Sequence, residues 1–177
     1  MTRSNLISLG FLLSVIVIGL IVSSFPKNST QPKLAETSPT GSPTPQPKDS
    51  SCDPSLWNHV YNPSRLKVIE PCLTLTGYID EVKREKDGDD HILLRLDKGE
   101  ENYLNNKNIE DQHGDLVLET VCINPATQLD AVAACAGFNN NITIPSRGTH
   151  VKVTGSYVLD TAHGWMEIHP VTKFEEM

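Results

Sequence analysis

The segment Leu73-Thr-Leu-Thr-Gly-Tyr-Ile-Asp-Glu-Val82 begins the β-rich part of this chain of 177 residues. Its side chains alternate between apolar and polar, and it carries β-branched residues, both of which favour a strand. Gly77 interrupts the pattern, as glycine does where a strand bends. The segment therefore predicts a long first strand that bends at Gly77.

Four more strands are predicted after it, over residues 91–97, 116–123, 150–158 and 165–174. Lys86-Asp87-Gly88-Asp89 is typical of a hairpin turn between the first two strands. In the second strand Ile92 and Leu94 are expected to face inward, and His91 outward. The chain is therefore predicted to be mainly β.

Three short helical segments complete the prediction. Asp53-Pro54 is typical of a helix start, and residues 64–70 are expected to form a short helical turn. Residues 127–136 are predicted to be helical, with Thr127 as N-cap and Asp130 three residues later. The resulting order, β-β-β-α-β-β with a long bent first strand, is that of an OB-fold, a five-stranded Greek-key barrel.

Two motifs carry a resemblance. Residues 87–91 read DGDDH, and residues 160–170 read DTAHGWMEIHP. Over residues 52–175 the chain resembles a family of small exported domains with DGD-x-H and HGW-x-EIHP motifs. This resemblance implies an OB-like barrel outside the cytoplasm and assigns a catalytic role to no residue.

The N-terminal 25 residues predict a membrane anchor or a signal peptide. Leu6 to Val22 is an apolar run without charge, preceded by Arg3 and followed by Lys27. We favour an uncleaved transmembrane anchor with a cytoplasmic N-terminus, because the run is longer than the usual signal core. The alternative is cleavage near Val22-Ser23-Ser24, which would give a secreted protein.

Residues 26–50 predict a disordered linker. They hold six of the twelve prolines and many Ser and Thr residues, with few large apolar groups to offset the entropy of ordering. Residues 51–177 then form the globular domain. The expected location is membrane-anchored, with this domain outside the cytoplasm.

All four cysteines lie in the globular domain, which agrees with an oxidising compartment. We expect two disulfides, Cys52 with Cys72 and Cys122 with Cys135, because each pair brackets a short helical segment. Each disulfide would stabilise the domain by about 3 kcal/mol in the chain-entropy model, because it closes a loop in the unfolded chain. The spacing does not support a zinc knuckle or ribbon.

Charge argues against nucleic acid as a partner. Residues 51–177 contain 11 basic and 20 acidic residues, a net charge of −9. Non-specific nucleic-acid binding depends on Lys and Arg contacts with phosphate, so an acidic domain disfavours it.

The candidate site residues come from three strands. Trp165, Glu167 and His169 share one face of the last strand, because side chains alternate. Glu119 lies on the side of its strand opposite Leu118, and His91 faces outward. We expect Trp165, Glu167, His169 and His91 to bind a ligand, although core packing is the favoured role for Trp165.

A metal is the second interpretation of the same residues. His91, Glu119, Glu167 and His169 form a ligand set acceptable to zinc or another divalent ion. Satisfied hydrogen bonds are the more common state of strand histidines, and no metalloprotease-type spacing is present.

Three functions remain open. We favour a membrane-tethered extracytoplasmic binding or interaction module over an enzyme, because no nucleophile–base motif is present. The alternatives are a metal-dependent hydrolase with a His/Glu site and a single-stranded nucleic-acid-binding domain.

Overall fold

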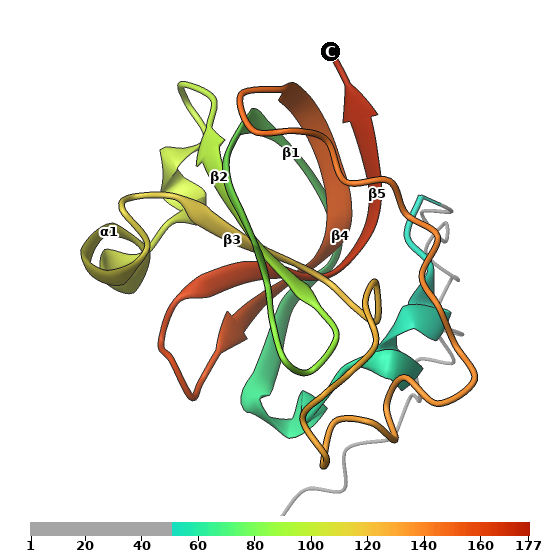
Figure 1. Cartoon of the computed structure of the whole chain (residues 1–177). Helices are drawn as coiled ribbons and strands as arrows, with labels where there is room; N and C mark the ends of the chain where they lie inside the picture. The colour runs from blue at the N-terminus through green and yellow to red at the C-terminus, as the bar shows by residue number, and fades with distance from the viewer. Residues whose placement is uncertain (1–50) are drawn as a thin grey trace, which may run out of the picture. The chain divides into compact units, whose positions relative to one another are not determined.

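The computed structural model describes residues 51–177, which form a mainly β structure with a few short helices (Figure 1). The strands are β1 (Leu66–Arg84), β2 (Asp90–Leu96), β3 (Leu116–Thr120), β4 (His150–Asp160) and β5 (Met166–Glu176). The predicted anchor and linker lie outside the described residues. Within residues 51–177, no helix is long and apolar enough to cross a membrane.

The five strands pair in a closed circuit in the order β1-β2-β3-β5-β4, with β4 returning to β1. Four of the five pairings are antiparallel, and β3 and β5 run parallel. The last strand therefore lies between β3 and β4. This order brings residues that are distant in sequence onto one surface.

Strand β1 is long and passes Gly77 as predicted. Gly77 pairs with Leu96 of β2 and also with Val151 of β4. A Cβ atom at Gly77 would lie 2.4 Å from the carbonyl oxygen of Arg95, so the backbones approach too closely for a larger residue. Glycine is required here because β1 joins both neighbours at this point.

The helical turn predicted for residues 64–70 is wrong over most of its length. Only Pro63–Arg65 forms a 3₁₀-helix, and β1 begins at Leu66. The first residues of β1 pair with the end of β4, where Leu66 lies opposite Asp160. Sheet pairing with a distant strand thus overrides the local helical pattern.

The helix predicted for residues 127–136 is also wrong. This segment forms successive turns, with hydrogen bonds such as Ala131 N–H to the Gln128 carbonyl and Ala134 N–H to the Ala131 carbonyl. The one α-helix of the described part is α1 (Asn106–Asp111), which lies between β2 and β3. Asn105 caps it with a capping box, so the observed order is β-β-α-β-β-β.

Two apolar clusters form the core. All five strands contribute to the larger cluster, which includes the fully buried Ile79, Leu94 and Ile168. A smaller cluster packs the 3₁₀-helix Pro54–His59, through Leu56, against Val158 of β4. The 3₁₀-helix Pro54–His59 therefore covers a part of the sheet that does not belong to the larger cluster.

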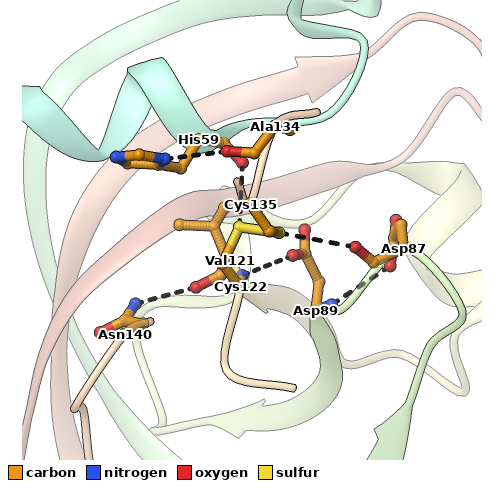
Figure 2. The surroundings of a disulfide bond; sticks show 8 residues. All are labelled: His59, Asp87, Asp89, Val121, Cys122, Ala134, Cys135 and Asn140. Atoms are coloured by element: carbon orange, nitrogen blue, oxygen red, sulfur yellow. Dashed lines mark hydrogen bonds between the residues drawn. A yellow bond between two sulfur atoms is a disulfide. The ribbon is translucent and has the colours of Figure 1, made fainter. Parts of the chain in front are cut away.

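Both predicted disulfides are confirmed, Cys52–Cys72 and Cys122–Cys135. The second joins the end of β3 to the turns of residues 127–136 (Figure 2). Asp89 lies beside it and accepts a hydrogen bond of 2.8 Å from the backbone N–H of Cys122. The two disulfides are consistent with an oxidising environment such as the extracellular space.

Candidate functional site

A pocket of about 610 Å³ opens beside strands β2, β3 and β5. Its lining includes four of the residues singled out from the sequence, namely His91, Glu119, Trp165 and Glu167. The fifth, His169, lies behind this wall with 1% of its surface exposed. Sequence alternation and strand pairing together therefore place the predicted residues at one site.

The strand register explains why these side chains meet. His91 of β2 lies directly opposite Glu119 of β3. Glu167 of β5 lies beside Val117 of β3, two residues before Glu119. Residues two apart on a strand share a face, so Glu119 and Glu167 project from the same side of the sheet.

His91 and Glu119 form the first of two histidine–carboxylate pairs. Nδ1 of His91 lies 2.7 Å from Oε1 of Glu119, and Nε2 lies 3.2 Å from Oε1 of Gln112. Burial raises the pKa of the Glu119 carboxyl, and the charge of Glu167 adds to this effect, although His91 opposes it. Burial alone would lower the pKa of His91, but its bond to Glu119 raises it.

These two directions belong to a coupled pair. An ionised Glu119 would stabilise the charged form of His91, and a protonated Glu119 would remove that support. Burial and the nearby carboxylate of Glu167 both raise the pKa of Glu119. The pair therefore retains a proton that an exposed carboxylate would lose.

Glu167 and His169 form the second pair. Glu167 accepts a hydrogen bond of 2.5 Å from Nε1–H of Trp165, and its other oxygen lies 3.2 Å from Nδ1 of His169. Burial alone would raise the pKa of Glu167, but the hydrogen bonds from His169 and Trp165 outweigh it and lower the pKa. Burial alone would lower the pKa of His169, and Glu167 raises it. Glu167 is thus held ionised.

One polar atom of this network lacks a partner. Nε2 of His169 is buried and makes no hydrogen bond with any of residues 51–177. The carboxylates of Glu119 and Asp89 act on the charge of this imidazole in addition to Glu167. The acidic groups around His169 therefore raise its pKa, although burial opposes the charged form.

Trp165 lines the pocket, and the favoured expectation of core packing is wrong. It belongs to neither apolar cluster. Its indole stacks on the ring of His163, with centroids 4.4 Å apart, and meets His91 edge-on at 6.2 Å. The N–H bond to Glu167 holds the indole at the wall, because a buried indole nitrogen requires an acceptor.

Asp160, which orients part of the site, was not among the residues predicted from the sequence. Asp160 is fully buried, forms an ion pair with Arg65, and accepts a bond of 2.7 Å from the backbone N–H of Ala162. Its Oδ2 lies 2.7 Å from Nδ1 of His163, which orients the ring that stacks on Trp165. Only the position of Asp160 at the start of the second motif could have indicated this role.

The four predicted metal ligands are not assembled around one point. Within residues 51–177, groups of three ligand atoms within 4.8 Å of one another comprise only two sets, Asp89/Cys122/Cys135 and Asp160/His163/Glu167. The first contains disulfide sulfurs, which are not available as thiolate ligands. In the second, both oxygens of Asp160 already accept hydrogen bonds. The donor geometry therefore does not favour a metal centre.

Neither protein-family models nor curated proteins yield a match to this chain. The functional interpretation therefore depends on the geometry of the pocket itself.

Proposed function

We propose that this protein is an extracytoplasmic binding module, tethered to a membrane through residues 1–25 and the linker 26–50. Its ligand occupies the pocket beside Trp165. The two disulfides support a location in an oxidising compartment. The orientation of the anchor remains the one predicted from Arg3.

We also assign the domain an OB-like barrel architecture. The closed pairing order and the long β1, which pairs with both β2 and β4, support this assignment. The position of α1 between β2 and β3 differs from the order predicted from the sequence. A helix inserted there leaves the strand pairings unchanged.

The observation that carries the binding proposal is the wall of the pocket. A tryptophan, two carboxyl groups and a histidine lie there in two hydrogen-bonded pairs, His91 with Glu119 and Trp165 with Glu167. Buried ionisable groups destabilise a fold unless they are paired, and a concave site with convergent polar groups is the usual form of a ligand site. The pocket thus has the features of a recognition surface.

The sequence-based alternatives have less support. A metal-dependent hydrolase requires a cluster of side chains that can hold the metal ion. The four predicted residues do not form such a cluster within residues 51–177. Single-stranded nucleic acid requires free cations, but both cationic side chains of the pocket are paired, Arg65 with Asp160 and Lys83 with Glu85. The pocket lining, which includes Glu119 and Glu167, therefore supports neither alternative.

Ligand-observed NMR with a library of small polar fragments tests the binding proposal. The full chain in detergent should bind a subset of fragments, and Trp165→Ala should abolish that binding. His150→Gln is the matched control, because His150 contacts Asp97 at 2.7 Å and is not part of the pocket lining. Binding that survives Trp165→Ala but is lost in the control would contradict the proposal.

A further inference from the structure

We propose that the Cys122–Cys135 disulfide is a reactive bond that exchanges with an external thiol, with Asp89 as the proton donor to the buried sulfur. This inference goes beyond the proposed binding pocket and does not depend on it. Three features of the bond support it, namely the unequal exposure of its two cysteines, an acid beside both sulfurs, and acceptors for both thiols of the reduced form.

The two cysteines of this bond differ in exposure. Cys122 is 1% exposed, whereas Cys135 is partly exposed in the turns of residues 127–136. Exchange begins with attack of a thiolate on one sulfur, and access decides which one. An external thiolate therefore attacks Cys135, and Cys122 is the group that leaves. The backbone of Cys122 has a φ of 53°, in the left-handed region, and such strained positions cluster at functional sites.

An acidic side chain lies beside both sulfurs (Figure 2). One carboxyl oxygen of Asp89 is within 4.8 Å of Sγ of Cys122 and of Sγ of Cys135. Asp89 is 3% exposed, and its Oδ1 accepts the backbone N–H of Cys122 at 2.8 Å, which fixes the position of the carboxyl group. The acid is therefore held against the sulfur that leaves.

Asp89 carries the proton that this step requires. Burial, and next the charge of Asp87, raise its pKa to about 7. Glu119 of β3 adds to this effect, whereas His169 of β5 and the N–H of Cys122 oppose it. Burial also disfavours the charged form of a departing thiolate, so a protonated carboxyl beside it lowers the cost of breaking the bond.

The reduced form has hydrogen-bond acceptors in place. Sγ of Cys122 lies 3.6 Å from the carbonyl oxygen of His59, and Sγ of Cys135 lies 3.7 Å from that of Asp87. In the disulfide neither sulfur carries a hydrogen, so only the two thiols can donate to these oxygens. Each S–H therefore has a partner when the bond opens.

The Cys52–Cys72 disulfide lacks these features. Within residues 51–177, no acidic side chain places an oxygen within 4.8 Å of both of its sulfurs. Both cysteines are partly exposed, so no buried thiolate would have to leave. This bond is therefore an internal control for the reactivity of Cys122–Cys135.

The exchange balances without a cofactor. The external thiolate forms a bond to Sγ of Cys135 as the disulfide breaks. The electron pair of the broken bond stays on Sγ of Cys122, which takes the proton of Asp89. A second external thiolate attacks the external sulfur of the mixed disulfide and releases Cys135, which takes a proton from solvent. Two external thiols are thus oxidised to one disulfide, the protein disulfide is reduced by two electrons, and Asp89 regains a proton from solvent.

The experiment uses the full chain in detergent with reduced glutathione or with a reduced peptide that contains one cysteine. Acid stops the reaction at increasing times, free thiols are alkylated, and mass spectrometry of proteolytic fragments locates each mixed disulfide. We expect the external thiol on Cys135, a free thiol at Cys122 and an intact Cys52–Cys72 bond. Reaction with either reagent supports the proposal, and the faster reagent identifies the source of the thiol as a small molecule or a polypeptide.

Asp89→Asn tests the proton donor. It should lower the second-order rate constant of exchange at about pH 6 by about 10²-fold, the low end of general acid catalysis, because a thiolate is a good leaving group. Asp115→Asn is the matched control, since Asp115 is also buried but does not lie within 4.8 Å of both sulfurs of either disulfide. Its rate should equal that of the natural protein, and near-UV circular dichroism confirms that both variants are folded.

The pH dependence gives an independent result. The thiolate is the attacking species, so the rate constant is divided by the ionised fraction of the external thiol. The corrected value should fall as the pH rises through about 7, where Asp89 loses its proton. Asp89→Asn should show no such fall.

Four results would overturn the inference. They are opening of Cys52–Cys72 before Cys122–Cys135, attachment of the external thiol to Cys122, equal rates in Asp89→Asn and the natural protein, and no reaction with either reagent. None of them affects the binding pocket, because fragment binding that depends on Trp165 is measured separately.

Discussion

Asp89→Asn should stabilise the protein at alkaline pH and leave its stability unchanged at acidic pH. Asp89 is 3% exposed and lies beside the Cys122–Cys135 disulfide (Figure 2). Burial, and next the charge of Asp87, raise its pKa from 3.8 to about 7, although His169 and the N–H of Cys122 oppose the change. The folded protein therefore favours the protonated carboxyl.

The direction follows from proton linkage. Between about pH 4 and pH 7 the folded state binds more protons at Asp89 than the unfolded chain, so the free energy of unfolding decreases as the pH rises. The contribution of this group is fully present below the unfolded pKa and is lost above the folded one. The difference between 3.8 and about 7 corresponds to roughly 4 kcal/mol.

Asparagine has no titratable group, and its amide oxygen can accept the hydrogen bond from the backbone N–H of Cys122. In the natural protein this bond is 2.8 Å long. Urea denaturation with intact disulfides measures the result. We expect Asp89→Asn to be more stable by up to about 4 kcal/mol at pH 8 and equal to the natural protein within about 1 kcal/mol at pH 4. Glu176→Gln, an exposed change at the end of β5, should show no such dependence.

Two results would refute this reasoning. Equal stabilisation at both pH values would mean that the gain has another cause than the titration of Asp89. A loss of stability at pH 8 would mean that the ionised carboxylate is better accommodated than its burial implies.

Three further changes test the fold by urea denaturation. Gly155→Ala should cost about 1–3 kcal/mol, because its Cβ would lie 2.4 Å from the carbonyl oxygen of Pro170; an unchanged midpoint would contradict this close approach. Replacing Cys122 and Cys135 together by alanine should cost about 3 kcal/mol, since the disulfide closes a loop with a sequence separation of 13. A loss well below 1 kcal/mol would show that the loop is ordered without it. Ile168→Ala should cost about 2–5 kcal/mol, because its side chain is fully buried in the larger cluster, and a smaller loss would mean that the cavity collapses.

The strands were predictable because alternation is a local property. The five predicted strands correspond to β1–β5, and Gly77 lies where β1 pairs with both β2 and β4. The start of β1 was not predictable, since Leu66 is in a strand only through its pairing with Asp160, far along the chain. Local pattern thus identifies a strand better than its ends.

The helices were predicted less well, for a different reason. Residues 127–136 have helical composition but are held by a disulfide at Cys135 and by hydrogen bonds of Thr127 and Gln128 to the carbonyl of Lys86. Helix α1 has six residues and depends on the cap at Asn105 rather than on an apolar face. Short capped helices leave little periodic signal.

The site was predicted in part. Alternation placed Glu167 and His169 on one face, and the structure shows them in contact at 3.2 Å. The pairing of His91 with Glu119 needed the register of β2 and β3, which no local pattern gives. The neighbours that orient the pocket, such as Asp160, depend on still more distant contacts.

The energetics of the pocket wall argue for a function rather than for stability. Replacing a buried ion pair by apolar residues is often neutral or stabilising, so a fold under no other requirement does not need Glu119, Glu167 and His169 inside. Here the three lie under 10% exposed, and one imidazole nitrogen is left without a hydrogen bond among residues 51–177. Positions that break the rules of stable packing are expected at functional sites.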